Sequence, residues 1–500
     1  MKLNLIPYPS SVEFATGCYA PEKPDDLRIA EIPEIVCGNG EAYKLEIAPD
    51  GITVTGGEAG RFYAMKTLEQ LRLQFPESFP CLNIVDSPRF AHRGFMLDSA
   101  RHFLPESDVL TLIDAAASFK LNRMHWHLSD DQGWRVEIKK YPRLAEVGSR
   151  RGKAVFADLN EPEESGGYFT QKQIRRIVSF ARERHIEIIP EIDMPGHFTA
   201  AIAAYPEISC TGESIPVATG GGIFENLLCA GKDENLVFLK DVMDELMELF
   251  PYPVVHIGGD EACKYHWREC PYCQARMRAL GLKDENVLQQ WLTIEMGKYL
   301  AEHGRKTMVY NESLRGADLP TNFIVQSWYG DHARIAAFAD RGGHVIQSDT
   351  RFLYFDYLYG EINLDTILNR DPYPDFLNEE QRKKVDGMEC MLWTERIPDL
   401  KMAVFRLFPR LPAFAEAAWT ADSARDNGSF ADRYRGVSAD FDRRRLKGAA
   451  PEEYWYPSEE LKAEERAWRD KIMDIPEMAE ARKRDAFLLA EDEKYYGTGY

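Results

Sequence analysis

From residue 93 onward, short apolar runs alternate with longer stretches whose apolar residues recur at helical spacing. Such alternation is typical of strand–helix repeats, which build parallel sheets. Eight runs are present, at 94–97, 123–128, 186–192, 254–257, 307–310, 323–328, 344–347 and 388–393. Helical patterns lie near 106–120, 171–184, 235–250, 285–302, 331–341 and 399–418, while 351–387 is less regular. The pattern predicts a (β/α)8 barrel, with a doubly wound open sheet as the alternative.

The chain before residue 89 has a different pattern of apolar residues. Short strand patterns lie at 3–6, 43–47 and 52–54, a helical pattern runs from 58 to 73, and several prolines mark the exit. We therefore predict three parts: a small α/β N-terminal domain at 1–88, the (β/α)8 barrel at 89–430 and a C-terminal helical extension at 431–500. The extension is rich in charged residues with periodic apolar ones, so we expect helices packed on the barrel exterior with solvated charged faces.

Polar and aromatic residues follow the carboxyl ends of the predicted strands. In a barrel all these ends open on one face, which is where barrel active sites lie. The residues gathered there are Arg101, Asp130, His197, Asp260, Glu261, Tyr310, Trp328, Tyr354, Asp356, Trp393 and Glu395. We expect them to surround one pocket.

The fourth run ends in Gly258-Gly259-Asp260-Glu261. Glycines allow a sharp turn and a close backbone approach. Neighbouring residues of an extended chain point to opposite faces, so the two acids are suited to separate tasks. The plainer interpretation is an acidic helix start, where carboxylates suit the helix dipole.

Other polar residues near the strands are predicted to be structural. His125 and His127 are expected in the packing of the barrel core, and His256 as a hydrogen-bonded structural residue. Asp98 is interpreted as a buried partner for Arg93.

Charge and hydropathy narrow the class of protein. A formal net charge of −20 argues against binding nucleic acid or an anionic membrane through bulk charge. No apolar stretch approaches the roughly 20 residues of a membrane span. The apolar stretch before Pro7 is too short for a signal-peptide core, so we expect a cytoplasmic protein, or a secreted one if a signal was removed.

Nine scattered cysteines do not form a disulfide scaffold. Cys263, His266, Cys270 and Cys273 are zinc-type ligands, but their two pairs are more crowded than the separation of about 12 residues or more in zinc modules. We predict packed free thiols and no metal, with a structural metal as the alternative.

Acids beside aromatic rings suit a sugar, because rings stack on pyranose faces and charged groups bind hydroxyls. Glycosidic cleavage commonly uses two carboxylates about 5 Å or more apart. Adjacent residues such as Asp260 and Glu261 do not readily flank a bond in this way. They fit a division of labour in which the substrate's 2-acetamido group is the nucleophile, one acid protonates the leaving group, and its neighbour orients the acetamide.

At this point the sequence resembles the β-N-acetylhexosaminidases of glycoside hydrolase family twenty. The similar stretches run in order along most of residues 1–420: NLIPYPSSVEF (4–14), RGFMLDSARHFLP (93–105), NRMHWHLSDDQGWRVEIKKYPRL (122–144), PEIDMPGH (190–197), HIGGDEA (256–262), VQSWYG (325–330), YFDY (354–357) and LWTE (392–395).

The resemblance implies a role for each candidate residue. Glu261 is implied as the general acid and then the base, and Asp260 as the holder of the acetamido nitrogen and stabiliser of an oxazolinium intermediate. Asp130 and His197 are implied to couple to Glu261, and the anomeric configuration to be retained. The implied substrate-binding residues are Arg101 and Glu395 for ring hydroxyls, Trp328 and Trp393 for the acetamido walls, Tyr354 for the acetamido oxygen, and Asp356 nearby.

One position departs from the family pattern. The family usually has a tryptophan at the end of strand five, and this chain has Tyr310 there, as another expected wall of the acetamido pocket. This keeps open a related hydrolase for a modified substrate, such as sulfated N-acetylglucosamine or disaccharide release. An inactive sugar-binding protein is a third alternative. We expect an oligosaccharide or glycoconjugate with a terminal N-acetylhexosamine as partner and no cofactor; the sequence predicts no oligomeric state.

Overall fold

A computed structural model describes residues 2–23, 26–156, 159–161 and 165–496. The outer ends of the predicted first and last parts, residues 1 and 500, lie outside this range. Within it, no helix has both the length and the apolar character needed to cross a membrane.

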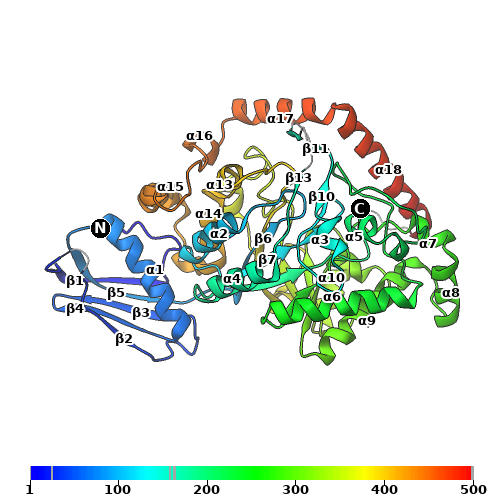
Figure 1. The fold of residues 1–500 in the computed structure, drawn as a ribbon. Coiled ribbons are helices and arrows are strands. Elements are labelled where there is room, and N and C mark those ends of the chain that lie inside the picture. Colours follow the sequence, from blue (N-terminus) through cyan, green and yellow to red (C-terminus); the bar gives the residue numbers. More distant parts are fainter. Residues whose placement is uncertain (1, 24–25, 157–158, 162–164, 497–500) are drawn as a thin grey trace.

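The N-terminal part is a five-stranded sheet covered by one long helix (Figure 1). The strand order is β1-β5-β3-β4-β2, with β1 Ser11–Tyr19, β2 Ile29–Ile32, β3 Tyr43–Ala48, β4 Gly51–Gly56 and β5 Phe79–Asp86. Side chains of β3 and β4 alternate between buried and half-buried, as expected for a sheet with one face packed. Helix α1 (Glu58–Gln74) covers that face, and its Tyr63 contacts Trp419 of the barrel at 5.2 Å between ring centroids.

The strand predicted at 3–6 is wrong, although the segment is buried. Ile6 donates its N–H to Gln70 Oε1 and accepts from Gln70 Nε2, at 2.8 and 2.7 Å. The side-chain amide of α1 therefore takes the place of a neighbouring strand.

The main body is a closed barrel of eight parallel strands, which confirms the barrel over the open sheet. The strands are β6 His92–Asp98, β7 Arg123–His127, β14 Glu187–Glu191, β15 Val254–His256, β16 Lys306–Tyr310, β17 Ile324–Ser327, β18 His344–Gln347 and β19 Val385–Leu392. β19 pairs with β6 over six residue pairs and closes the ring. Closure leaves no edge strand to be protected.

Helices surround the barrel, and most lie where the sequence predicts them. They are α2 Glu106–Ser118, α4 Gln171–Arg182, α6 Asp233–Leu249, α9 Glu285–Glu302 and α10 His332–Asp340, with short α3 Arg143–Glu146, α5 Thr199–Ala204, α7 Tyr265–Glu269, α8 Pro271–Leu280, α11 Leu364–Asn369 and α12 Glu379–Arg382. The helix predicted at 399–418 is two helices, α13 (Leu400–Leu407) and α14 (Arg410–Trp419). Pro409 explains the break, because proline has no N–H to donate to the preceding turn.

The barrel interior changes character along its axis. At the amino-terminal end Ile189, Val254, Met308 and Ile346 form an apolar layer. Above it lies a fully buried ionic layer, in which His125 Nδ1 lies 2.8 Å from Glu389 Oε1 and His127 pairs with Glu191. Although burial opposes charge, the two glutamates raise the pKa of His125 to about 9. His125, His127 and His256 are all buried in this layer, as predicted.

The C-terminal extension lies over the face where the strands end, rather than only on the barrel exterior (Figure 1). After α15 (Phe430–Val437) and α16 (Glu452–Trp455), α17 (Glu459–Met473) and α18 (Pro476–Tyr496) arch across that face. Arg469 of α17 pairs with Glu361, and Arg484 of α18 donates to the carbonyl oxygens of Gly221 and Ile223, both at 2.7 Å. The extension therefore forms part of the wall of whatever site the strand ends create.

A buried ion pair connects the three parts of the chain. Arg433 of α15 donates to Glu416 of α14 at 2.6 Å and to the carbonyl oxygen of Leu5 at 2.7 Å, and Glu416 also accepts from the N–H of Tyr8. Both charged side chains are essentially inaccessible. Removing one partner of such a pair leaves a buried charge without compensation.

We expect Arg433→Met to lower the free energy of unfolding by about 3–5 kcal/mol, measured by guanidinium denaturation. The matched control is Arg435→Met two residues later, whose guanidinium pairs with Glu452 at the surface and should leave the curve nearly unchanged. Equal losses of unfolding free energy in the two variants would show that the buried pair contributes no more to stability than the surface pair.

Candidate active site

A cavity of about 480 Å³ opens at the carboxyl ends of the barrel strands. Its lining combines carboxylates, cations and aromatic rings from the loops after several strands, and side chains from α17 and α18. The residues include Arg101, His197, Asp260, Glu261, Trp328, Tyr354, Asp356, Tyr357, Glu361, Trp393, Glu395, Arg469, Ile472, Met473 and Met478. The structure thus brings together nine of the eleven predicted site residues around one space.

The turn after β15 is shaped by two glycines. Gly258 has φ +63°, and a Cβ there would lie 1.7 Å from Asp193 Oδ1. Gly259 has φ +107° and donates its N–H to the same oxygen at 3.0 Å. Only glycine fits this close approach, which directs the next two residues, Asp260 and Glu261, into the cavity.

Glu261 is the acid of the turn that is open to the cavity, with 31% of its side chain exposed. Its Oε2 lies 3.5 Å from His197 Nε2, and His197 Nδ1 lies 3.2 Å from Asp130 Oδ1 and 3.0 Å from Asp131 Oδ2. Burial disfavours the charged imidazole, but the Asp130 carboxylate outweighs it and holds the pKa of His197 well above its usual value. A charged histidine therefore connects a buried carboxylate to the exposed acid.

Asp130 joins the two sides of the site. Its Oδ2 lies 2.7 Å from Arg101 Nη2 and 2.8 Å from His127 Nε2. Burial opposes ionisation, yet Arg101 and the two histidines hold the pKa of Asp130 well below its ordinary value. Asp130 is thus a permanent anion that fixes the positions of Arg101 and His197.

Asp260 is almost fully buried beside a second carboxylate. One carboxylate oxygen of Asp260, one of Asp193 and one ring nitrogen of His197 lie within 4.8 Å of one another. Burial and the neighbouring Asp193 raise the pKa of Asp260 well above its ordinary value, and burial and the Glu191 carboxylate do the same for Asp193. Two neighbouring carboxylates resist ionising together, so Asp260 supplies less negative charge to Glu261 than its position in the sequence suggests.

Three aromatic rings form a wall of the cavity. Trp328 and Tyr354 are stacked with centroids 6.2 Å apart, and Tyr354 and Trp393 lie 6.4 Å apart. Trp328 donates its indole N–H to Glu312 Oε2 at 2.9 Å, and the Arg101 guanidinium lies 4.9 Å from the Trp393 ring. A polar or charged neighbour therefore holds each tryptophan in place, and Tyr354 packs between the two.

Asp356 and Glu395 add carboxylates to the same cavity. Burial, and then the neighbouring Glu395, raise the pKa of Asp356 to about 7. Near neutral pH Asp356 can therefore act either as a donor or as an acceptor toward a hydroxyl group.

Comparison with known proteins identifies this arrangement. The family model described as "Glycosyl hydrolase family 20, catalytic domain" matches residues 90–422, and "Glycosyl hydrolase family 20, domain 2" matches residues 20–87. The chain belongs to glycosyl hydrolase family 20. It is therefore a glycoside hydrolase, and its barrel is the family's catalytic domain.

Individual relatives agree with the family assignment. A β-hexosaminidase of Porphyromonas gingivalis is 38% identical over 414 residues, covering 79% of this chain and 52% of that protein, so the chain spans about half of that relative. A β-hexosaminidase of Akkermansia muciniphila is 35% identical over 475 residues, covering 90% of this chain and 94% of that protein. A family-20 exo-β-N-acetylglucosaminidase of Vibrio harveyi, solved with N-acetylglucosamine, has a TM-score of 0.79 and 30% identity, covering 91% of this chain and 79% of that one.

Two predicted site residues of this family-20 enzyme lie behind the cavity lining. Asp130 acts on the cavity through Arg101 and His197, as described above. Tyr310 was expected to wall the acetamido pocket, but its side chain is fully buried. Its ring packs 4.5 Å from that of His256, and its hydroxyl lies 3.4 Å from Glu191 Oε2. Tyr310 supports the floor of the site rather than its surface.

The predicted partner of Asp98 is wrong. Asp98 lies 3.3 Å from Arg101 Nη1 and accepts from Thr394, so it belongs to the family-20 site. Arg93 instead pairs with Glu41 of the N-terminal part at 2.7 Å. Arg93 and Glu41 lie 52 residues apart in sequence, a separation that a single-sequence pattern does not reveal, whereas Asp98 and Arg101 are only three residues apart.

Asp193 and the roof residues of α17 were missed from the sequence. Asp193 lies in the strand-end segment that also supplies His197, so the clustering of polar residues at strand ends could have identified it. Arg469, Ile472 and Met473 lie in a charged helix with no local signal of a site.

Several groups of residues in the described part of this hydrolase have metal-type ligands close together. Asp130, Asp131 and His197 form one group, and His125, Glu191 and His256 another. In both, carboxylates face imidazoles at hydrogen-bonding distance, so each carboxylate already has an imidazole partner. A third group consists of four cysteines and contains no imidazole partner of this kind.

We expect Asp130→Asn to lower the pKa of His197, followed by NMR of ¹³C-labelled imidazole and assigned with His197→Gln. In the unaltered protein the raised pKa stabilises the fold fully below the unfolded value of about 6.5, and this stabilisation is lost only as pH rises through the folded-state value. In the variant that loss moves to lower pH. Asp241→Asn on helix α6, which contacts Tyr141, is the control and should leave His197 unchanged. An unchanged His197 titration in Asp130→Asn would contradict the coupling.

Proposed function

We propose that this family-20 glycoside hydrolase is a retaining exo-β-N-acetylhexosaminidase that removes terminal non-reducing N-acetylglucosamine or N-acetylgalactosamine. The observation that carries the proposal is the unequal pair on one turn. Glu261 is open to the cavity and touches a charged histidine, whereas Asp260 is buried beside Asp193. The names of the Porphyromonas, Akkermansia and Vibrio relatives support the same substrate class.

The inequality of the pair supports catalysis by the substrate's own acetamido group. In the first step the acetamido oxygen bonds to the anomeric carbon, the glycosidic bond breaks, and Glu261 gives its proton to the leaving oxygen. This yields an oxazolinium intermediate. In the second step Glu261 takes a proton from water, and the water oxygen attacks the anomeric carbon. This opens the oxazolinium ring and leaves the anomeric configuration retained.

Asp260 is assigned to the nitrogen side of this intermediate. A buried carboxylate beside the acetamido N–H can accept its hydrogen bond and balance the positive charge that develops. Asp193, whose pKa is also raised, can carry the proton of the pair, which leaves Asp260 ionised toward the acetamido nitrogen. Tyr354 would donate to the acetamido oxygen, with Trp328 and Trp393 as walls.

Arg101, Glu395 and Asp356 are assigned to ring hydroxyls. Arg101 is held by Asp130 and Asp98 and still lines the cavity, so it can donate in a fixed direction. The roof from α17 favours action at chain ends, because Ile472 and Met473 line the cavity opposite the strand ends. A cavity of about 480 Å³ suits one or two sugar units rather than a long groove.

The alternatives drawn from the sequence lose their basis. A modified substrate was suggested by Tyr310, which lies behind the lining and leaves the acetamido wall to other rings. An inactive sugar-binding protein has no need for buried charges that run from Asp130 through His197 to the acid Glu261.

The direct test is hydrolysis of p-nitrophenyl N-acetyl-β-glucosaminide and its galactosamine analogue, with the anomer formed first followed by NMR. We expect turnover of at least one of them with release of the β-anomer. No turnover of either substrate by folded protein would refute the proposed activity, and release of the α-anomer would refute retention.

We expect Glu261→Gln to reduce hydrolysis of N,N′-diacetylchitobiose by about 10²–10⁴-fold. Cleavage of an aryl glycoside with a good leaving group should fall much less, because that leaving group needs little protonation. Steady-state kinetics on both substrates measures the difference. Glu269→Gln, at an exposed position of α7, is the control and should resemble the unaltered enzyme. Equal losses on both substrates would show that Glu261 is not the acid.

We expect Asp260→Asn to weaken inhibition by a thiazoline mimic of the intermediate by about tenfold or more, the value of a hydrogen bond to a charged group. Inhibition constants measured with an aryl substrate give the ratio. Asp318→Asn, on an exposed loop, is the control. An unchanged constant in Asp260→Asn would contradict the assignment of Asp260 to the acetamido nitrogen.

A further inference from the structure

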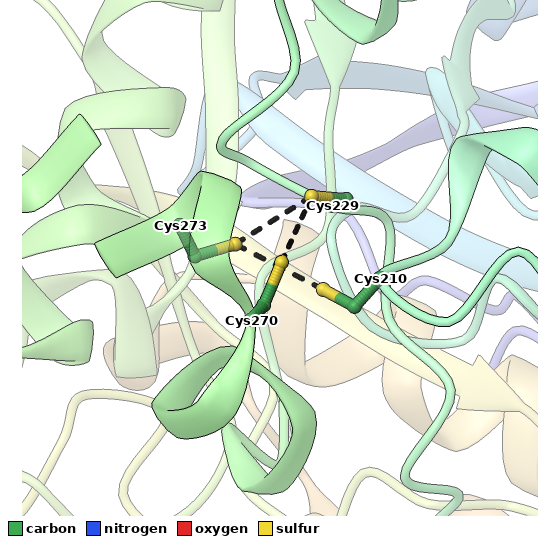
Figure 2. Close-up of side chains that lie close together, drawn as sticks. All are labelled: Cys210, Cys229, Cys270 and Cys273. Carbon is green, nitrogen blue, oxygen red and sulfur yellow. Dashed lines mark hydrogen bonds between the residues drawn. The ribbon is translucent and has the colours of Figure 1, made fainter. Parts of the chain in front are cut away.

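Four cysteines from three separate segments converge beside the catalytic loops (Figure 2). Cys210 follows the short helix η1 (Pro206–Ile208), Cys229 lies before α6, and Cys270 and Cys273 lie at the start of α8. All four sulfur atoms lie within 4.8 Å of one another. Three of the side chains are buried and Cys210 is half-buried.

The sulfur positions have the dimensions of a tetrahedral metal site. The Sγ atoms are 3.8 Å apart for Cys210 and Cys273, 3.7 Å for Cys229 and Cys270, and 3.6 Å for Cys229 and Cys273. A tetrahedron with zinc–sulfur bonds of about 2.3 Å has edges of about 3.8 Å. A disulfide would need a separation of about 2.05 Å, and these cysteines are free.

The backbone holds the four positions without help from the sulfurs. Asn235 Nδ2 donates to the carbonyl oxygens of Ile208 and Cys229 at 2.7 and 2.8 Å. A Cβ on Gly231 would lie 2.1 Å from the carbonyl carbon of Tyr272, so the segment after Cys229 packs directly on the start of α8. The ligand positions are thus pre-organised, as support around metal ligands requires.

The charges around the cluster favour thiolates. Cys270 is the N-cap of α8, and Cys273 lies in its first turn, where free N–H groups and the helix dipole stabilise anions. Lys232 donates to the carbonyl oxygens of Glu207 and Ser209, next to Cys210, and Arg276 donates to the carbonyl oxygen of Gly231. These cations complement the net charge of about −2 that four thiolates and a divalent ion would carry.

We propose that Cys210, Cys229, Cys270 and Cys273 bind one structural Zn²⁺ ion. Four thiolates form a soft ligand set that suits zinc and not magnesium or calcium. All four coordination positions are taken by protein, so the ion has no open site for a substrate or water. The site is therefore a clamp and not a second catalytic centre.

The clamp joins the two loops that carry the acid machinery. Leu228, next to Cys229, donates its N–H to the carbonyl oxygen of Pro195, two residues before His197. Trp267, three residues before Cys270, donates its indole N–H to the carbonyl oxygen of Leu228 at 3.0 Å. Zinc would thus tie the loop of His197 to the loop of Glu261.

The assignment revises the prediction of packed thiols, and it changes the ligand set. Cys270 and Cys273 remain, but Cys263 packs near Ile223 and Leu488, and burial raises the pKa of Cys263 to about 11. Neither Cys263 nor His266 belongs to the cluster. The two missing ligands come from residues 41 or more positions away in sequence, beyond the reach of a local spacing rule.

The test is elemental analysis of the full chain purified from medium that contains zinc. We expect about one zinc ion per chain, and loss of most of it in Cys210→Ser and in Cys273→Ser. Cys263→Ser, in the same region, is the matched control and should keep its zinc. Full zinc in the Cys210 and Cys273 variants would overturn the proposal, because the ion would then lie elsewhere.

Cobalt exchange in the unaltered chain decides the question if the variants do not fold. Co²⁺ bound to four thiolates should give strong thiolate-to-cobalt charge-transfer bands and the intense visible bands of a tetrahedral site. Absence of both zinc and such bands, with these four cysteines reacting as free thiols or joined as disulfides, would refute the site. None of these readouts depends on turnover, so the result is independent of the proposed hydrolase activity.

Discussion

The site depends on charges that are buried and individually compensated. An isolated carboxylate in a protein interior is very costly, so each one must keep its partners in place. Asp130 is the centre of this constraint, because its two oxygens meet Arg101, His127 and His197. Moving any of these groups away would leave the negative charge of Asp130 in a low-dielectric environment without full compensation. The same electrostatic requirement therefore fixes a substrate-binding guanidinium on one side of the cavity and the histidine beside Glu261 on the other.

Around this centre the backbone leaves little room for adjustment. The turn at Gly258 and Gly259 fits against Asp193 with no space for a side chain. A Cβ on Gly196 would lie 3.1 Å from the carbonyl oxygen of Asp260, so the loop of His197 packs directly on the loop of Glu261. Hydrogen bonds of Leu228 and Trp267 connect the cysteine cluster to the same two loops. Close packing, buried charge and the four converging sulfurs therefore all restrain the contact between the loop of His197 and the loop of Glu261.

The sequence predicted the elements and the face of the site well because these follow from local patterns. Strands with two buried faces appear as apolar runs, and polar residues after them must lie at one end of a barrel. What it did not predict depends on contacts across long separations. Tyr310 follows its strand as a site residue would, yet its ring is covered by neighbours from other strands. The pairing of Arg93 with Glu41, the hydrogen bond from Thr394 to Asp98, the acid pair of Asp193 with Asp260, and the two distant cysteines are all of this kind.

The roof of the cavity has a consequence for how the molecule becomes active during its synthesis. Arg469, Met473 and Met478 line the cavity, although they lie beyond residues 90–422, the part matched by the catalytic-domain model. A nascent chain that has completed its barrel has every acid in place but still lacks one side of the pocket. Its strand ends would remain open to solvent until α17 and α18 leave the ribosome and cross them. The enclosed binding space therefore forms only after the barrel, and a chain without α17 and α18 would carry the chemical groups without the enclosure.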